Sequence, residues 1–411
     1  MKTIVFPGQG SQSKGMGAEL FKKYPGLMEK SNNILGYSIE DVCLNNPNGN
    51  LNKTEYTQPA LYVVNALSYY EKLESIVEKP DYFAGHSLGE YNALLAAECF
   101  DFETGLKLVK KRGELMSKAP KGAMAAILNS SKEEIEITLE KNNLLEIDLA
   151  NYNTLSQIVI SGDAEQISQA QAFFQEGQTL YYPLNTSGAF HSRFMKPARE
   201  EFKKYLNEFS FNDPCTKVIS NVTAQPYEPG CVVENLSSQL SSGVRWYESI
   251  FYLMKLSPSM SFEEVGNGEV LSKMIAHLEE DYTNQVSSGQ VTIRMDSSQK
   301  YSGSATGSSD HTDSEKKFEK ASGSIAQVEK IQEWMSASTI QPQSETANEK
   351  VKKWNSSLPV GSVVKSTMKD YGELKTRTQA IILFGHRAAV YMEGYKGYFD
   401  LDELTPVHKK I

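Results

Sequence analysis

The chain has 411 residues, of which 40% are hydrophobic, and a formal net charge of −9 at pH 7. This length allows two to three domains. The acidic balance argues against nucleic acid or an anionic membrane as the main partner. No apolar run reaches the ~20 residues of a membrane span. The four cysteines lie far apart, without a CxxC pair or histidines at metal-ligand spacing. We therefore expect reduced thiols, no bound metal and a cytoplasmic location.

The residues around Ser87 predict a nucleophile. An apolar run at 82–84 is followed by the sequence Gly85-His86-Ser87-Leu88-Gly89. Gly-x-Ser-x-Gly between a strand and a helix is a nucleophile elbow, in which the glycines leave room for a tight turn. A helix predicted over 88–99 would point its free N–H groups at charge developing on Ser87. Because so short a pattern also arises by chance, the neighbouring segments have to support it.

The first strand supports it. Residues 4–6 read as a buried parallel strand, and 7–12 (Pro-Gly-Gln-Gly-Ser-Gln) form the loop at its carboxyl end. Sites in open α/β sheets lie at the carboxyl ends of strands, so this loop and the Ser87 turn could face one another. A plain strand-to-helix turn would explain the glycines but not the two glutamines.

The middle of the chain predicts a second fold unit. Strands are expected at 124–128, 145–151, 157–161 and 179–183, with helices at 132–141 and 164–174. This order of strand, helix, strand, strand, helix and strand is the ferredoxin-like unit. We therefore predict an α/β protein whose α/β-hydrolase-like catalytic core, residues 1–121 and 188–283, carries a ferredoxin-like subdomain at 122–187.

The remaining residues have a different composition. Residues 284–350 are rich in Ser, Gln, Thr, Glu and Lys, which is typical of a disordered, low-complexity linker, and they include one helical patch at 325–335. Residues 351–411 regain alternation, with strands expected at 362–368, 378–384, 388–393 and 395–401. Their glycine turns and tyrosines predict a small, SH3-like β module, which we interpret as an interaction module.

Ser87 needs a general base, because a serine hydroxyl is a weak nucleophile at neutral pH. His86 lies inside the elbow, where its ring would point away from the serine hydroxyl, and His277 lies in a charged segment. The other three candidates in the linker and tail are His311, His386 and His408. His191 is left as the base, although a histidine in a loop can also be purely structural.

Residues 1–283 resemble the malonyl-CoA:acyl carrier protein transacylases. The matching segments stand in the family's order and spacing: 6–12, 85–90, 111–116, 157–162, 188–192 and 244–246. The residues of these segments are most similar to those of the stand-alone, trans-acting acyltransferases that serve polyketide synthases without an acyltransferase domain of their own. The resemblance implies malonyl transfer from malonyl-CoA to the phosphopantetheine thiol of an acyl carrier protein, in polyketide (including antibiotic) or fatty acid biosynthesis.

The resemblance also implies roles for individual residues. Ser87 becomes malonylated, and His191 moves its proton. The backbone N–H groups of Gln9 and Leu88 form the oxyanion hole. In place of a triad carboxylate, the backbone carbonyl at Gln239 orients the imidazole.

Two further positions concern the substrate. Arg112 matches the arginine that binds the free carboxylate of malonyl, and its planar guanidinium suits that group. The alternative is that Arg112 belongs to a solvated basic run with Lys110 and Lys111. Phe190 is similar to the residue found in malonyl-selective members, where a bulky ring crowds an α-methyl group.

The resemblance implies no bound cofactor, since malonyl-CoA is a substrate, and it names an acidic acyl carrier protein as the partner. The C-terminal module could dock a polyketide synthase. Basic candidates for carrier or CoA contact are Lys107, Lys110 and Lys111, or the group Arg193, Lys196, Arg199, Lys203 and Lys204.

Three alternatives stay open. An acyl hydrolase that clears stalled chains from carrier proteins would share the fold, although such relatives tend to lose the arginine. A scaffold role could belong to the tail, and a generic esterase would want an acid between Ser87 and His191. One departure from the family is Gly266-Asn267-Gly268, where Gly-Pro-Gly is usual; we expect it to affect stability only modestly.

Overall fold

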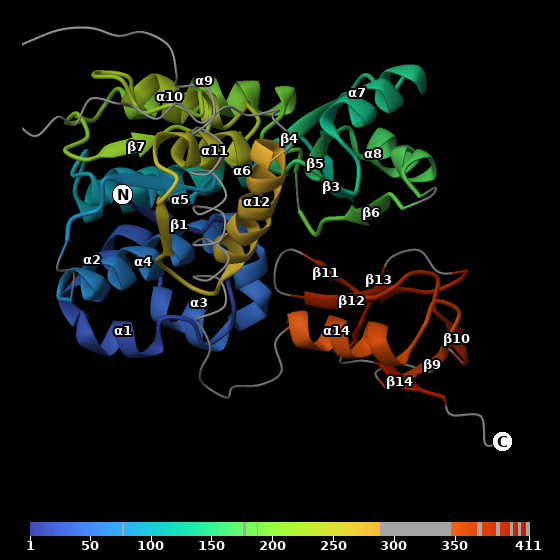
Figure 1. Ribbon diagram of the computed structural model, residues 1–411. Coiled ribbons are helices and arrows are strands. Elements are labelled where there is room, and N and C mark those ends of the chain that lie inside the picture. Colours follow the sequence, from blue (N-terminus) through green and yellow to red (C-terminus); the bar gives the residue numbers. More distant parts are fainter. Residues whose placement is uncertain are drawn as a thin grey trace, which may run out of the picture.

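The computed structural model describes residues 1–75, 78–175, 178–186, 188–287, 347–367, 372–383, 387–394, 398–401 and 404–407. The helical patch predicted at 325–335 lies outside these residues. Within them the chain is a mixed α/β protein with four sheets (Figure 1).

A parallel sheet forms the centre of the N-terminal part. Its strands are β1 (Lys2–Phe6), β2 (Tyr82–Gly85), β7 (Lys217–Ile219) and β8 (Ser261–Glu264), in the order β7-β2-β1-β8. The apolar runs of β1 and β2 fit this position, because parallel strands are covered on both faces. Phe6 pairs with Gly85 at the carboxyl end of the two strands. The loop after β1 and the Ser87 turn therefore start side by side, as the sequence predicted.

Helices cover the two faces of this sheet. The face that carries Ile4, Phe6 and Phe83 packs into the main core with helices that include α4, α9 and α10, and the face that carries Val5 and Ala84 packs into a second core with α11 and α12. The helices of this part are α1 (Ala18–Lys23), α2 (Pro25–Leu35), α3 (Ile39–Asn45), α4 (Thr54–Leu73), α5 (Gly89–Ala96), α6 (Phe102–Ser117), α9 (Lys196–Leu206), α10 (Val232–Gln239), α11 (Trp246–Leu256) and α12 (Val270–Ser287), with short 3₁₀ turns at Pro47–Asn52 and Arg193–Met195.

Helix α6 positions a candidate site residue. Asp101 caps its N-terminus by accepting a hydrogen bond from the Thr104 N–H, which satisfies a donor that has no partner inside the helix. Its apolar face, formed by Leu108, Leu115 and Met116, is buried. This packing against α4 turns one face of α6, including Arg112, into the protein interior.

The second unit has the predicted element order. It consists of β3 (Ala123–Leu128), α7 (Lys132–Lys141), β4 (Ile147–Thr154), β5 (Gln157–Gly162), α8 (Ala164–Ala170), a 3₁₀ turn (Gln171–Phe173) and β6 (Leu180–Pro183). The strands form an antiparallel sheet in the order β4-β5-β3-β6. Alternation along β3 sends Ala125 and Ile127 to a separate core beneath α7 and α8, and Met124 and Ala126 to the main core.

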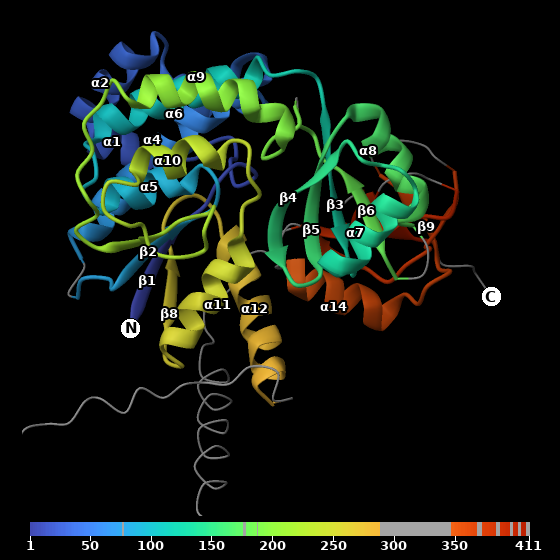
Figure 2. The same ribbon diagram turned by 90° about the horizontal axis from the view of Figure 1, so that it is seen from above.

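The C-terminal part begins with a helix that the sequence did not predict, α14 (Ala347–Ser357). It is followed by two three-stranded antiparallel sheets: β10-β9-β14, from β9 (Val363–Ser366), β10 (Leu374–Lys375) and β14 (Leu404–Pro406), and β11-β12-β13, from β11 (Ile381–Leu383), β12 (Arg387–Tyr391) and β13 (Tyr398–Asp400). Both views place these strands next to the β3–β6 sheet (Figures 1 and 2).

A tyrosine cluster joins the two sheets. The Tyr391 hydroxyl donates to the Tyr181 carbonyl at 3.1 Å, and the Tyr391 and Tyr182 rings lie 5.0 Å apart. Tyr391 and Ala389 belong to the main core cluster. The C-terminal strands therefore pack on the sheet face opposite α7 and α8. Among the described helices, none is long and apolar enough to cross a bilayer.

Candidate active site

The Ser87 turn is strained and tightly enclosed. Ser87 has a φ of 52°, a left-handed conformation that non-glycine residues rarely adopt. A Cβ on Gly85 would lie 2.0 Å from the Gly89 carbonyl carbon, and a Cβ on Gly89 would lie 2.0 Å from the Phe6 carbonyl oxygen. Only glycine fits at these two positions, which explains the spacing Gly-x-Ser-x-Gly. Strain of this kind is common where a side chain has to be presented for chemistry.

Ser87 and His191 form a hydrogen-bonded pair. The Ser87 Oγ lies 2.8 Å from His191 Nε2, and His191 Nδ1 lies 2.8 Å from the Gln239 carbonyl oxygen. Because a carbonyl can only accept, the proton is assigned to Nδ1, and Nε2 is left with a lone pair facing the Ser87 hydroxyl. Burial and the Arg112 charge lower the pKa of His191 to about 3. The imidazole is therefore neutral near pH 7 and can accept a proton.

Arg112 reaches the same hydroxyl. Its side chain is 1% exposed, and Nη2 donates to Ser87 Oγ at 3.1 Å and to Gln239 Oε1 at 2.9 Å. The guanidinium carbon lies 5.5 Å from the centre of the Tyr91 ring, a cation–π contact. The buried Nε donates to none of the described residues. The alternative that Arg112 belongs to a solvated run with its neighbours is wrong, since it is buried.

The two predicted oxyanion donors flank the Ser87 turn. A Cβ on Gly8 would lie 2.3 Å from the His86 carbonyl oxygen and 3.5 Å from the Leu88 nitrogen, so the loop carrying Gln9 runs directly over the turn. No hydrogen bond from the N–H of Gln9 or Leu88 to another described residue is present. The Ser87 N–H, in contrast, donates to Asn221 Oδ1 at 2.7 Å. The Ser87 N–H is therefore already paired and is not available as an oxyanion donor.

Phe190 and the remaining histidines take separate places. Phe190 is buried in the main core cluster, which also contains Met116. His86 points away from Ser87, as predicted: its Nε2 lies 2.9 Å from Asn153 Oδ1, and its ring lies 5.4 Å from the Trp246 ring. His277 is exposed on α12. His311, His386 and His408 lie outside the described residues.

Several site residues were missed by the sequence reasoning. Asn221 clamps the elbow by accepting from the Ser87 N–H and donating to the Gly85 carbonyl at 2.7 Å. Glu90 is fully buried and bonded to Gln239. A carboxylate in the first turn of the mostly apolar 88–99 segment was a signal for Glu90. No signal in the sequence distinguishes Asn221, which lies 134 residues from Ser87.

Most of the basic candidates already have partners in the chain. Five hydrogen bonds or ion pairs account for them: Lys110 with the Ile34 carbonyl at 2.9 Å, Lys111 with Glu201 at 2.7 Å, Arg193 with Asp148 at 2.5 Å, and Arg199 and Lys203 with Glu234 at 3.1 and 2.6 Å. Lys107, Lys196 and Lys204 make no ion pair with another described residue. These three keep their charges available to a partner.

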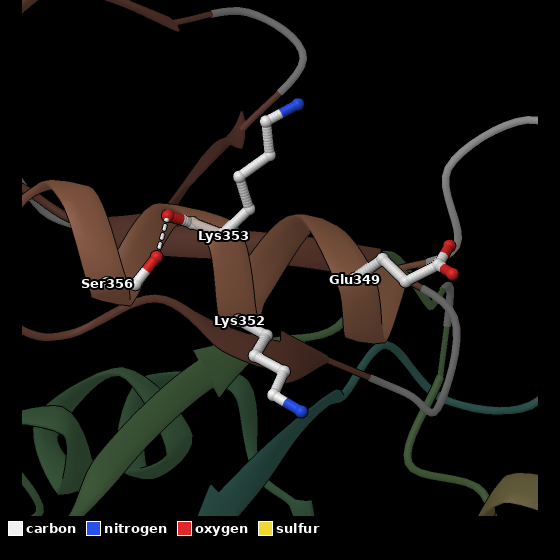
Figure 3. A pocket seen from close by; sticks show the side chains of 4 residues that line it. All are labelled: Glu349, Lys352, Lys353 and Ser356. Carbon is white, nitrogen blue, oxygen red and sulfur yellow. Dashed lines mark hydrogen bonds between the residues drawn. The ribbon is translucent and has the colours of Figure 1, made fainter.

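A surface pocket on α14 is separate from Ser87. Figure 3 shows its lining residues, Glu349, Lys352, Lys353 and Ser356, with the Ser356 hydroxyl donating to the Lys353 carbonyl at 2.8 Å. None of the predicted site residues lines it. In the described part of the chain, no cluster of three or more His, Cys, Asp or Glu residues could hold a metal ion, and the four cysteines are free thiols.

Comparison with known proteins defines the family. Residues 3–263 match the acyl transferase domain family, and the chain belongs to it. It is 52% identical over 283 residues to a polyketide biosynthesis malonyl CoA-acyl carrier protein transacylase of Bacillus subtilis, a match that covers 68% of this chain and 98% of the relative.

Two solved structures are also similar. A malonyl CoA-acyl carrier protein transacylase from Burkholderia pseudomallei shares 53% identity, with a TM-score of 0.67, over 68% of this chain and 98% of the other. A malonyl-transacylase in complex with its holo type II polyketide synthase acyl-carrier protein shares 30% identity, with a TM-score of 0.63, over 69% of this chain and 93% of that one.

Proposed function

We propose that the protein is an acyl carrier protein S-malonyltransferase of polyketide biosynthesis, with malonyl-CoA as donor and a carrier protein as acceptor. The observation that carries the proposal is the convergence of a neutral His191 and the Arg112 guanidinium on one serine oxygen, at 2.8 and 3.1 Å. A base activates the nucleophile, and a buried cation beside it suits an acyl group that carries its own carboxylate.

Acylation follows from this geometry. The Ser87 oxygen attacks the thioester carbonyl of malonyl-CoA while its proton moves to His191 Nε2. The N–H groups of Gln9 and Leu88 donate to the oxygen of the tetrahedral intermediate, where such donors are worth most. The C–S bond then breaks, and His191 returns the proton to the departing CoA sulfur. The product is malonyl-Ser87.

Transfer to the carrier protein runs the same steps in reverse. His191 takes the proton of the phosphopantetheine thiol, the sulfur attacks the malonyl ester, and Ser87 leaves with the proton. The Gln239 carbonyl holds the imidazole through Nδ1 in both halves, so that Nε2 always faces the reacting oxygen. This carbonyl does the orienting work for which many hydrolases use a carboxylate.

Arg112 selects the acyl group in this scheme. Its Nε lacks a hydrogen-bond partner in the described chain and so offers a donor to the malonyl carboxylate. A carboxylate buried without such a partner would be costly. Since the Arg112 charge helps to lower the pKa of His191, a bound malonyl carboxylate would offset that charge and make the base stronger. We further propose that Phe190 limits the space beside the malonyl α-carbon.

The hydrolase alternative has less support. Its water-mediated second step needs no carboxylate-binding cation, whereas the guanidinium is held in the site by one hydrogen bond to Ser87 and one to Gln239. Three relatives that share 50–52% identity with the chain are named as malonyl CoA-acyl carrier protein transacylases or polyketide biosynthesis proteins. The expected acidic carrier protein would meet the lysines that make no ion pair, Lys107, Lys196 and Lys204. The cytoplasmic location stays a prediction.

The domain division is also a proposal. We assign residues 1–121 and 188–283 to an α/β-hydrolase-like catalytic core, 122–187 to a ferredoxin-like subdomain, 284–350 to a linker and 351–411 to an SH3-like β module that could dock a polyketide synthase. Deleting residues 284–411 should leave turnover of a free carrier protein largely intact if the module only docks. Loss of malonyl-Ser87 formation after this deletion would contradict a pure docking role.

Intact-mass spectrometry tests the proposed function. The protein is mixed with malonyl-CoA and then with a phosphopantetheinylated carrier protein, and acetyl-CoA and a long acyl-carrier thioester run in parallel. A malonyl adduct that is absent in Ser87→Ala and moves to the carrier supports the transferase. Hydrolysis of the acyl-carrier thioester without a malonyl adduct would favour the hydrolase instead.

A further inference from the structure

Glu90 is a buried carboxylate that the reaction scheme does not use. It lies in the first turn of α5, three residues after Ser87, with no exposed surface. Oε1 accepts from the Tyr227 hydroxyl at 2.6 Å and from the Asn221 N–H at 3.2 Å. Oε2 accepts from Gln239 Nε2. All three partners are donors, so this arrangement suits an ionised carboxylate.

Gln239 connects this carboxylate to Ser87, Arg112 and His191. Its Nε2 also donates to the Ser87 carbonyl at 2.9 Å, its Oε1 accepts from Arg112 at 2.9 Å, and its backbone carbonyl accepts from His191 at 2.8 Å. The amide can face only one way. Reversing it would turn Oε1 towards two acceptors and the NH₂ group towards the donor-only guanidinium.

The buried charges of Arg112 and Glu90 also indicate that the two residues are coupled. Arg112 is buried and has no carboxylate within ion-pair distance among the described residues. A buried cation of this kind needs compensation. The buried carboxylate nearest in the hydrogen-bond network is Glu90, one amide group away. Burial raises the pKa of Glu90 to about 7, and its three hydrogen bonds and the Arg112 charge oppose that rise.

We propose that Glu90 is a positioning residue for the transfer reaction: its carboxylate fixes the Gln239 amide, and through Gln239 it holds both His191 and Arg112 against Ser87. The inference deepens the proposed malonyl transfer and rests on it. Glu90 touches neither substrate nor reacting atoms. Its effect is relayed by one residue, Gln239, whose side chain contacts Arg112 and the Ser87 carbonyl and whose backbone carbonyl accepts from His191.

Glu90→Gln is the sharpest variant. The new amide oxygen can still accept from Tyr227 and Asn221, but its NH₂ group then faces the NH₂ group of Gln239. The hydrogen bond to Gln239 is therefore lost, although the side chain keeps nearly the same size and shape. Because a hydrogen bond to a charged group is involved, we expect the rate of Ser87 acylation by malonyl-CoA to fall about 10- to 100-fold. Acetyl-CoA acylation should fall less, since an acetyl group has no carboxylate for Arg112 to bind.

Tyr227→Phe is the matched control. It removes a different hydrogen bond from the same carboxylate and leaves the Gln239 contact in place, so its acylation rates should stay within about threefold of wild type although its Tm falls. The measurement is rapid-quench intact-mass spectrometry of acyl-Ser87 with both CoA esters, at temperatures where circular dichroism shows each variant to be folded.

The outcomes separate the two claims. If wild type forms no malonyl-Ser87, the proposed function fails. If wild type is acylated and Glu90→Gln reacts at the wild-type rate with only a lower Tm, Glu90 is structural and the inference is overturned. If Glu90→Gln does not fold, Glu90→Asp replaces it. This variant keeps the charge but withdraws it from Gln239, so the inference requires slower acylation, and an unchanged rate would reject it.

Discussion

Replacing Arg112 by alanine tests how the enzyme distinguishes malonyl from acetyl groups. The substitution removes the guanidinium that donates to Ser87 Oγ and Gln239 Oε1 and leaves the substrate carboxylate without a cation. Both substrates lose the hydrogen bonds to Ser87 and Gln239, and only malonyl-CoA loses the contact between the guanidinium and its carboxylate. The two losses can therefore be separated by comparing the two CoA esters.

The magnitude follows from the burial of the side chain. Removing one partner of a buried charge pair costs about 3–5 kcal/mol, and 1.36 kcal/mol corresponds to a factor of ten. We therefore expect kcat/KM for malonyl-CoA to fall about 150- to 5,000-fold. The hydrogen bonds to the serine and the amide account for about tenfold with either ester. The preference for malonyl over acetyl should then fall about 15- to 500-fold.

The assay is steady-state transfer to a holo carrier protein with each ester, together with the occupancy of acyl-Ser87 by intact mass. Lys111→Ala is the control. Lys111 is the adjacent cation, but it forms an ion pair with Glu201 on the outer face of α6, and surface pairs contribute about 0–1 kcal/mol. Equal losses for malonyl-CoA and acetyl-CoA in Arg112→Ala would refute the argument and limit Arg112 to supporting Ser87 and Gln239.

Three further predictions concern the oxyanion loop, the base and the turn at Asn267. Gln9→Pro removes a backbone N–H and should lower kcat about 10²- to 10³-fold, whereas Gln9→Ala keeps the N–H and should stay near wild type; equal rates for the two variants would remove Gln9 from the oxyanion hole. The pKa of His191 is lowered to about 3 from 6.5, so the unfolded chain binds a proton that the folded chain refuses, and stability falls as the pH drops through this window. Glu90, whose pKa is raised to about 7, contributes the opposite pH dependence, and His191→Gln keeps this contribution, so comparing the two proteins removes it. Between pH 7 and 5 the unfolding free energy of wild type, measured by urea denaturation, should fall by about 2 kcal/mol more than that of His191→Gln. Parallel pH dependences of the two proteins would contradict the lowered pKa of His191. Asn267 donates to the Ser11 carbonyl and to Ser13 Oγ, so Asn267→Ala should lower the free energy of unfolding by about 1–2 kcal/mol in the same denaturation assay. An unchanged midpoint would show that these hydrogen bonds do not stabilise the loop.

Local sequence was sufficient for many of the elements and for the turn that presents the serine. Strands at 4–6 and 82–84, helix 132–141 and the element order of the β3–β6 unit were all predicted from periodicity and are present. One described helix was not predicted: α14 (Ala347–Ser357) lies where the composition indicated only a linker and a β module.

The sequence could also name Ser87 and His191 as candidates from the elbow motif and the elimination of other histidines, and Arg112 and Gln239 from the resemblance to the transacylase family. It could not place them. The Ser87–His191 contact joins residues 104 positions apart, and the Arg112–Gln239 contact joins residues 127 apart. A distance between such residues is fixed by how the sheet and helices pack, which no local pattern encodes.

Glu90 and the C-terminal module show the same limit. A carboxylate in a first helical turn is ordinarily a favourable charge at a helix N-terminus, and only the fold encloses Glu90 among Tyr227, Asn221 and Gln239. Likewise, the tyrosines of the tail predicted strands, but the hydrogen bond from Tyr391 to Tyr181 spans 210 residues. The sequence by itself determined the elements, the elbow and the residue types of the site. The tertiary structure decided which buried polar groups satisfy one another, because burial removes water and leaves each donor and acceptor only the partners that packing brings within reach.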